Sequence, residues 1–266
     1  MSEPQSRRPL AATQIMNDIR FEGVTKSFGR DKVLKGITIT FPAGKLSYIL
    51  GSSGAGKSVM LKHILGLLQP DTGLVHVAGQ NMTQLKGDER ANFRKIFGVL
   101  FQNSALFDDI TIFENVAFPL REHTRLTEKE ITEKVTKTLT ILGMTSGYDK
   151  LPNQLSGGMK KRVGLARAII REPGVLLYDE PTTGLDPVTR TTVDALIETL
   201  KREFKLTSVV ISHDLPSALL LADRIAFLHQ GQIVFWGTPS EFRQCEHEAI
   251  QAFLAAERRS LRAFEV

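Results

Sequence analysis

The segment Gly51–Ser58 constrains this chain most, because it fits the phosphate-binding pattern G-x-x-x-x-G-K-[ST]. The largely apolar run Leu46–Leu50 precedes the segment and an apolar helical pattern follows it, so a strand delivers the loop and a helix begins at its end. A chance glycine-rich turn is the alternative, and the order of strand, loop, Lys-Ser pair and helix argues against it. The sequence therefore predicts a chain that binds a nucleoside triphosphate.

Each residue type in this loop suits a bound phosphate. Glycine allows the backbone to curl until successive N–H groups point at one anion without clashes of Cβ atoms. We expect Lys57 to reach the β- and γ-phosphates and Ser58 to offer its hydroxyl to Mg²⁺, at the positive end of the following helix. The expected nucleotide-binding residues of the loop are Gly51, Ser52, Ser53, Gly54, Ala55, Gly56, Lys57 and Ser58.

Composition narrows the class of protein without deciding its partner. A chain of 266 residues with 42% hydrophobic content can bury a substantial core. The net charge of +5 could favour nucleic acid or an anionic membrane surface, but Lys and Arg are scattered among acidic residues. Cys245 is the only cysteine, which excludes an intramolecular disulfide and cysteine-cluster metal sites. No run approaches the roughly 20 apolar residues of a membrane span, and the start lacks a signal-peptide core, so we expect a cytosolic protein.

The hydrophobic patterning predicts an α/β fold. Apolar and polar residues alternate from Ile19 to Phe41 around a turn, and this pattern, with a further run near Val75, predicts antiparallel strands. Short continuous apolar runs, typical of strands buried on both faces, occur at residues 97–101, 175–178, 208–211 and 225–228. Helical patterns lie between these runs, so we expect the core sheet to be largely parallel.

A helical insertion interrupts the strand pattern between Ser104 and Ile170. Apolar residues recur at helical spacing from Ile131 to Leu142, and we expect the ion pairs Glu130–Lys134 and Glu133–Lys137 to support that helix. The predicted parts are a disordered N-terminus at 1–14, a nucleotide-binding domain at 15–245 with a helical subdomain at about 104–170, and a helical C-terminal tail at 246–266.

Polar residues stand at the ends of three buried strands, where ligands of open α/β sheets bind. Asp179 and Glu180 end one strand. Because neighbouring strand residues point to opposite faces, we expect one to join the Mg²⁺ shell and the other to orient the attacking water. Gln102 ends a second strand, where its amide can contact Mg²⁺ or water, and His213 ends a third, where its imidazole can hydrogen-bond a γ-phosphate oxygen. Each residue alone is more often a strand terminus or a cap, and the phosphate loop upstream favours the functional interpretation.

A second anion-binding motif lies in the helical insertion. Ser156, Gly157 and Gly158 stand directly before a helical pattern, and a hydroxyl, two glycines and a helix N-terminus suit a phosphate. The chain already has a loop for one nucleotide, so the simplest use of the second motif is to hold the γ-phosphate bound to another copy. The sequence thereby predicts a head-to-tail homodimer with shared sites, with an ordinary helix-start turn as the alternative.

These motifs, in this order, resemble those of ABC-type ATPases over nearly the whole chain. Residues 184–187, Gly-Leu-Asp-Pro, match the dimer-contact loop of that family, and Phe28 stands where an aromatic residue stacks on adenine. The resemblance implies a P-loop ATPase with a largely parallel core sheet, an antiparallel β subdomain and a helical subdomain, using ATP and Mg²⁺. The roles that it implies are metal contacts by Ser58, Gln102 and Asp179, catalysis by Glu180 as the principal base with His213 on the γ-phosphate, and action in trans by Ser156, Gly157 and Gly158.

Residues 101–124 and 156–162 look like those of the Mla-type lipid-transport ATPases, the MlaF-like proteins. In that family the ATPase pairs with a permease and an MCE lipid-binding protein to move phospholipid between Gram-negative membranes. The resemblance implies a peripheral subunit on the cytoplasmic side of the bacterial inner membrane, with an MlaE-like permease and an MlaD-like MCE protein as partners and no nucleic acid. Ser104, in place of a usual glycine, and Thr182, where Phe often stands, depart from the pattern.

The stretch from Ser104 to Thr124 holds more apolar residues than a solvated connector needs. A groove that receives a cytoplasmic helix of a permease would explain some of them. Ordinary packing of the helical subdomain is the better explanation for most.

Other classes of function stay open at this point. A soluble ABC ATPase acting on chromosomes or ribosomes fits the basic pI of about 9.3, but such proteins generally carry long coiled-coil insertions or two cassettes, and this chain has neither. An ABC transporter ATPase for another substrate is a second alternative. A nucleotide-binding regulator without catalysis is a third, and the joint presence of Gln102, Asp179, Glu180 and His213 argues against it.

The substitution Gly157→Asp tests the predicted sharing of sites. A carboxylate at the second motif repels the γ-phosphate that the partner holds, so we expect nucleotide binding to persist and turnover to stop. Both quantities can be measured on the purified protein, by nucleotide titration and by phosphate release. An active variant would remove the argument for a site completed in trans.

Overall fold

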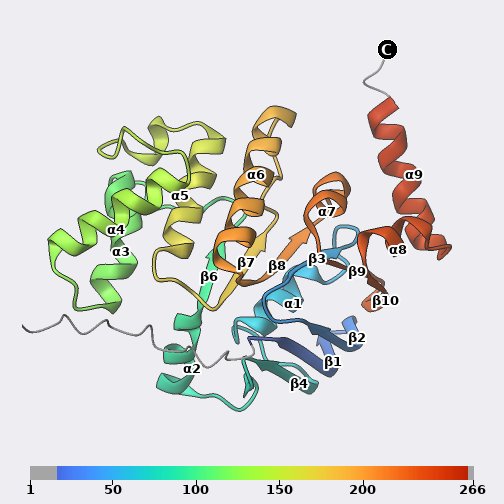
Figure 1. The fold of residues 1–266 in the computed structure, drawn as a ribbon. Coiled ribbons are helices and arrows are strands. Elements are labelled where there is room, and N and C mark those ends of the chain that lie inside the picture. The colour runs from blue at the N-terminus through green and yellow to red at the C-terminus, as the bar shows by residue number, and fades with distance from the viewer. Residues whose placement is uncertain (1–16, 263–266) are drawn as a thin grey trace, which may run out of the picture.

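The computed structural model describes residues 17–262, so the predicted disordered segment 1–14 lies outside the described residues. The strands are β1 Ile19–Phe28, β2 Asp31–Phe41, β3 Leu46–Leu50, β4 Thr72–Val77, β5 Gln80–Asn81, β6 Phe97–Leu100, β7 Val175–Asp179, β8 Thr207–Ser212, β9 Arg224–His229 and β10 Gln232–Gly237. The helices are α1 Lys57–Ile64, α2 Gly87–Phe93, α3 Ile112–His123, α4 Glu128–Ile141, α5 Gly157–Ile169, α6 Pro187–Phe204, α7 Leu215–Leu221, α8 Pro239–Gln244 and α9 Glu248–Arg262, with short 3-10 turns η1 Arg94–Ile96 and η2 Pro152–Gln154. Figure 1 shows their arrangement.

A six-stranded sheet in the order β10-β9-β3-β8-β7-β6 forms the centre of the molecule. The strands from β9 to β6 pair in parallel, and β10 joins the edge antiparallel to β9. The prediction of a largely parallel core sheet is therefore confirmed. The apolar runs of the sequence did not predict β10. A two-residue turn at Gln230 and Gly231, with φ angles of 48° and 80°, joins it to β9 in a hairpin.

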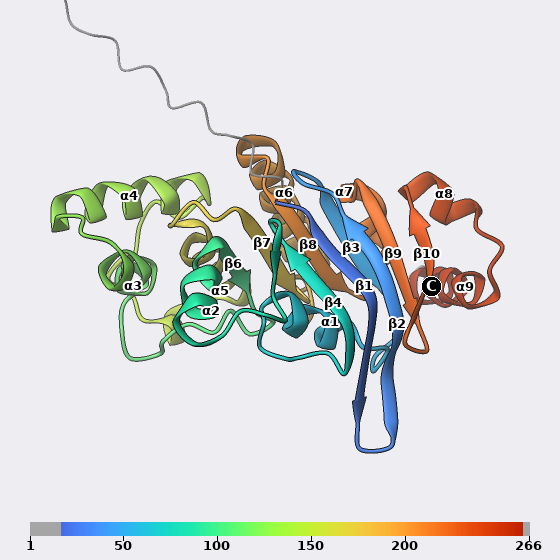
Figure 2. The ribbon, with the colours of Figure 1, turned by 90° about the horizontal axis from the view of Figure 1, so that it is seen from below.

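The second sheet, in the order β2-β1-β4-β5, is antiparallel, as the alternating pattern predicts. Helix α1 packs against both β4 of this sheet and the parallel strands β7 and β8. Seen from below, the hairpin of β1 and β2 extends beyond the other strands (Figure 2). The phosphate loop thus begins its helix in the space between two sheets.

Side chains of the parallel strands divide between two hydrophobic cores because alternate residues face opposite sides. Ile49, Leu177 and Val209 face the core that contains α1 and the antiparallel sheet. Leu50, Tyr178 and Val210 face the core that contains the helices on the other side. Burial on both faces explains why these strands are continuous apolar runs in the sequence.

Helices α3, α4 and α5 lie together at one end of the molecule, on the left of Figure 1. The apolar residues of α4, from Ile131 to Leu139, are buried there, together with Leu142. The predicted ion pairs are wrong. Glu130 instead forms a capping box with Thr127, and Lys134 reaches Glu172 at 2.8 Å. Within residues 17–262, no ion pair joins Glu133 to Lys137. Glu130 is used by the helix cap and Lys134 by Glu172, so the i,i+4 pair between them does not form.

Helices α8 and α9 pack onto the edge of the parallel sheet. The ring of Phe227 on β9 lies 5.8 Å from that of Phe242 on α8 and 5.2 Å from that of Phe253 on α9. Ile250 of α9 is fully buried in the same core. Among the helices that the structure describes, none combines the length and apolar character needed to span a membrane. The domain limits at residues 15, 104, 170 and 245 stay predictions.

Candidate functional site

The loop from Gly51 to Gly56 joins β3 to α1 and requires glycine for reasons of both backbone angle and space. Gly54 and Gly56 have φ angles of 78° and 108°, which side-chain-bearing residues rarely adopt. A Cβ atom on Gly51 would lie 2.3 Å from the carbonyl oxygen of Leu228, and one on Gly56 would lie 2.9 Å from Leu34. The loop is therefore packed backbone to backbone against β9.

The N-terminus of α1 offers free backbone donors to an anion. Gly56 occupies the N-cap position, where it has no side chain to satisfy the first N–H groups of the helix. These N–H groups and the helix dipole favour a phosphate at this point. The local geometry therefore fits the predicted triphosphate.

The ammonium of Lys57 lies inside the curve of the loop. It donates hydrogen bonds to the carbonyl oxygens of Gly51, at 2.8 Å, and Ser52, at 3.1 Å. Burial lowers the pKa of Lys57, while Glu180 and Asp179 favour its charged form. A bound phosphate could take over these contacts, because its oxygens are better acceptors for an ammonium than carbonyl groups are.

Asp179 and Glu180 are not both strand residues, so their side chains need not point to opposite faces of the sheet. Asp179 ends β7, but Glu180 lies beyond the strand with a φ angle of 49°, so the strand alternation on which the expectation of opposite directions rested does not apply to this pair. The backbone N–H of Glu180 still donates to the carbonyl of Ile211 on β8, which fixes the turned residue against the sheet. Both carboxylates line one cavity as a result.

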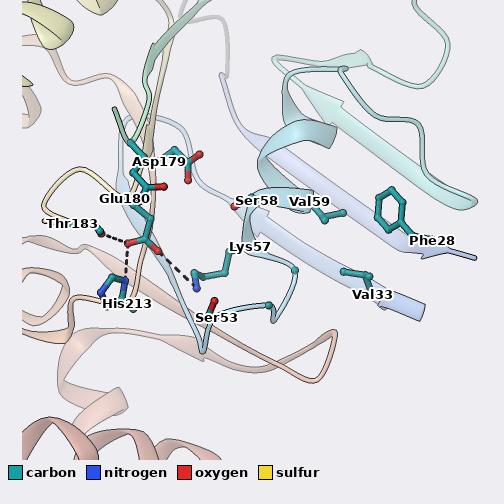
Figure 3. Close-up of a pocket in the computed structure, with 13 residues that line it drawn as sticks. Phe28, Val33, Ser53, Lys57, Ser58, Val59, Asp179, Glu180, Thr183 and His213 are labelled. Carbon is teal, nitrogen blue, oxygen red and sulfur yellow. Dashed lines mark hydrogen bonds and ion pairs between the residues drawn. The ribbon is translucent and has the colours of Figure 1, made fainter. Parts of the chain in front are cut away.

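Three groups hold the carboxylate of Glu180 (Figure 3). Its Oε2 atom accepts a hydrogen bond from Thr183 Oγ1 and lies 2.9 Å from His213 Nδ1, while its Oε1 atom is 3.9 Å from Lys57 Nζ. The side chain of His213 remains 57% exposed toward the cavity. Thr183 is a residue that sequence reasoning missed, and its only signal was a hydroxyl three positions after Glu180. A carboxylate fixed from several sides cannot turn away from the cavity.

The cavity at this edge of the sheet has a volume of about 670 Å³, a size suited to a nucleotide. The predicted residues that line it are Phe28, Ser53, Gly54, Gly56, Lys57, Ser58, Gln102, Asp179, Glu180 and His213. Gly51, Ser52 and Ala55 belong to the loop without lining the cavity. Phe28, about half exposed at the end of β1, presents its ring beside the ammonium of Lys26 at 5.7 Å. An exposed aromatic ring on the cavity wall can stack on a planar base.

The donor set of Ser58, Gln102 and Asp179 suits a hard divalent cation. A hydroxyl, an amide and a carboxylate from three different elements line the same cavity. Burial raises the pKa of Asp179, and the neighbouring Glu180 raises it further against the opposing charge of Lys57. Mg²⁺ prefers such oxygen ligands and takes its remaining ones from phosphates and water. These residues therefore fit the predicted metal contacts.

The second anion-binding motif lies outside this cavity. Ser156 caps α5 by accepting a hydrogen bond from the N–H of Met159 at 3.3 Å. Ser156 and Gly158 line a different hollow, with Thr189 of α6 on its wall. A Cβ atom on Gly157 would meet nothing closer than Leu185 at 3.5 Å, so this position accepts a side chain. Within one chain the two anion-binding motifs lie at different hollows. This separation is what a site shared between two copies requires.

The chain is similar to known ATP-binding proteins along most of its length. Residues 34–183 match the family described as ABC transporter. A protein of Haemophilus influenzae named intermembrane phospholipid transport system ATP-binding protein MlaF is 37% identical over 241 residues, which cover 91% of this chain and 91% of the relative. The Arabidopsis thaliana protein TRIGALACTOSYLDIACYLGLYCEROL 3, chloroplastic, is 40% identical over 88% of this chain and 72% of its own length.

The chain is also similar to a mycobacterial protein and to a solved structure. A Mycobacterium tuberculosis protein named probable ribonucleotide transport ATP-binding protein mkl is 38% identical over 90% of this chain and 67% of its own length. The ATP-binding cassette MJ0796, solved as a dimer in a post-hydrolysis state with ADP and Pi, superposes with a TM-score of 0.76 at 31% identity, covering 83% of this chain and 98% of the cassette.

A matched pair of glycine substitutions tests the geometry of the phosphate loop. Gly51→Ala forces a methyl group onto the carbonyl of Leu228, so we expect nucleotide affinity to fall about ten-fold or more, which corresponds to about 1.4 kcal/mol. Gly54→Ala meets no atom within 4 Å and bears only the strain of its backbone angle, of order 1 kcal/mol. Titration with a fluorescent ATP analogue measures both. Equal losses in the two variants would contradict the backbone packing described above.

Proposed function

This chain belongs to the ABC transporter family of ATP-binding proteins, and on that premise we propose that it is the ATP-hydrolysing subunit of a transporter that moves phospholipids between membranes. The chain is an ATPase. The observation that carries the lipid assignment is the alignment with the phospholipid-transport protein MlaF along 91% of both chains. The mkl relative, named for ribonucleotides, offers a second substrate class, but only 67% of its length is covered.

In this proposal the side chains of the cavity divide the work of phosphoryl transfer. Lys57 leaves the carbonyls of its own loop and neutralises charge on the β- and γ-phosphates. Glu180 accepts the proton of the attacking water, and Thr183 and His213 keep its carboxylate in place. Mg²⁺, held by Ser58, Gln102 and Asp179, supplies further neutralisation of phosphate charge when bound. Phe28 stacks on the adenine of ATP.

The proposed working unit is a head-to-tail homodimer. Ser156, Gly157 and Gly158 stand at the N-terminus of α5, away from the cavity of their own chain. A second copy facing the first would bring the partner subunit's Ser156 to the γ-phosphate. ATP would then close the dimer and hydrolysis would reopen it, because the phosphate is the contact that both copies share.

An exposed aromatic groove supports the proposed permease partner. Phe101, Phe107 and Phe118 are 40%, 43% and 41% exposed, and they line a hollow of about 360 Å³. Pro119 and the basic side chains of Arg167 and Arg171 also line it. Gln102 follows directly after Phe101, so the groove lies next to the nucleotide cavity in the chain. We propose that a cytoplasmic helix of an MlaE-like permease binds here.

The remaining partners follow from the same proposal. An MlaD-like MCE lipid-binding protein would join the complex through the permease, and this chain would lie peripherally on the cytoplasmic side of the inner membrane. The proposal includes no nucleic acid. The aromatic groove suits a protein helix, whereas a soluble ABC ATPase acting on chromosomes or ribosomes would need a surface for nucleic acid. Salt-sensitive binding of DNA or RNA without membrane association would reverse this preference.

The substitution Phe118→Glu tests the permease groove. A carboxylate at this position removes an aromatic contact and can pair with the basic side chains of the groove wall, Arg167 and Arg171, so the apolar surface for a helix is lost. We therefore expect co-purification with membrane protein from native membranes to fall at least about ten-fold. Basal hydrolysis should stay unchanged. Leu220→Glu on α7, at a residue 73% exposed, is the matched control and should retain association. Undiminished co-purification of the Phe118 variant would contradict the groove as the docking site.

The substitution Glu180→Gln tests the proposed base. The amide keeps the shape of the side chain but cannot accept the proton, so we expect hydrolysis to fall about 100-fold or more. ATP binding should persist and the closed dimer should accumulate, which size-exclusion chromatography with ATP would detect. Hydrolysis within a few-fold of the unsubstituted protein would count against Glu180 as the base.

A further inference from the structure

One short loop connects the nucleotide cavity to the aromatic groove. The loop of residues 101–107 follows β6, and its Gln102 lines the cavity while Phe101 and Phe107 line the groove. Any displacement of this backbone therefore changes both surfaces. The contacts that hold the loop decide where the amide of Gln102 lies.

The loop backbone has an unfavourable conformation. Ser104 and Ala105 are consecutive residues with φ angles of 59° and 46°, in the left-handed region that favours glycine. Ser104 is also buried. Such a conformation persists only where surrounding contacts enforce it.

One face of α5 supplies those contacts. Lys161 and Arg167 donate hydrogen bonds to the backbone carbonyl oxygens of Gln102 and Ser104, the second at 2.9 Å. Gly164 lies midway between them, and a Cβ atom there would be 2.9 Å from Leu100 and 3.1 Å from Ser104. Spacings of three residues place these three on the same side of the helix. The helix thus holds the loop by two cations and one close approach.

Of the two cations, Lys161 is more deeply buried than Arg167, so its charge costs more free energy to bury. Its residue is only 4% exposed, and the hydrogen bond that the structure gives its ammonium goes to the Gln102 carbonyl. Burial lowers the pKa of Lys161 to about 8, although Asp179 and Glu180 favour the charged form. An apolar side chain would fill the same space without this cost. The ammonium is therefore present for the contact that it makes.

We infer that Lys161 is a positioning residue of the ATPase reaction, which holds the Gln102 amide at the nucleotide cavity through the Gln102 carbonyl. The inference rests on the role proposed above for Gln102. Because α5 begins at Ser156–Gly158, the helix that holds Gln102 in one site also carries the motif proposed to reach the nucleotide of the partner. Each chain of a dimer would thereby connect its own site mechanically to that of its neighbour.

A double-mutant cycle between Lys161 and Gln102 tests this inference on the purified full-length protein. Lys161→Met should lower kcat about ten-fold or more, as misplacement of a reacting group does, and leave the KM for ATP within two-fold. Lys161→Arg, which can still donate to the carbonyl, should recover most of the rate. Lys160→Met, on the same helix turn but without a hydrogen bond from its side chain to the loop, is the matched control and should have unchanged kcat.

The decisive comparison is the double variant. If Lys161 acts through Gln102, then Lys161→Met combined with Gln102→Ala should be no slower than Gln102→Ala alone. Additive losses in kcat, with Gln102→Ala itself impaired, would overturn the inference and leave the proposed function intact. A fully active Gln102→Ala variant would contradict the proposed role of Gln102 and the inference with it. If thermal unfolding shows that the Met variant does not fold, Lys161→Ala, which also lacks a side-chain donor, replaces it in the same cycle with the same expected outcomes.

Discussion

The parallel pairing of β3, β8 and β7 is the constraint on which the rest of the structure depends. Leu50 pairs with Ser212 and Asp179 pairs with Ile211, so the carboxyl ends of the three strands finish at one edge. The residues that follow these ends are the phosphate loop, the carboxylate of Glu180 and the imidazole of His213. Their convergence in one cavity is a result of strand register, and the two cores that bury both faces of the sheet fix that register.

Much of this fold could be predicted from the sequence because the governing signals are local. Continuous apolar runs identified the buried strands, the phosphate loop follows a strict pattern, and the ABC-type assignment is confirmed by the family match over residues 34–183. Features set by tertiary competition could not be predicted. The φ angle of Glu180 depends on the hydrogen bond that its N–H donates to β8, and Glu172, the partner of Lys134, lies 38 residues further along the chain. The burial of Lys161 likewise depends on a loop that lies 59 residues away in the chain.

The two departures from the family pattern have physical explanations. Ser104 stands at a position with a φ angle of 59°, where glycine would fit without strain, and α5 supplies the contacts that let a serine adopt it. Thr182 is buried and donates a hydrogen bond to Asp214 at 2.9 Å, which ties the turn after β7 to the turn after β8. A phenylalanine could not make that bond. Both substitutions therefore keep the geometry of the site by different contacts.

Each nucleotide is proposed to lie between two copies of the chain, because the motif at the start of α5 does not line the cavity of its own chain. The most direct test is the rate of ATP hydrolysis per chain as a function of protein concentration, with the mass of the species determined in the same solutions. We predict that the rate per chain falls toward zero as dilution separates the dimer into single chains. A constant rate in solutions that contain only single chains would contradict the shared site.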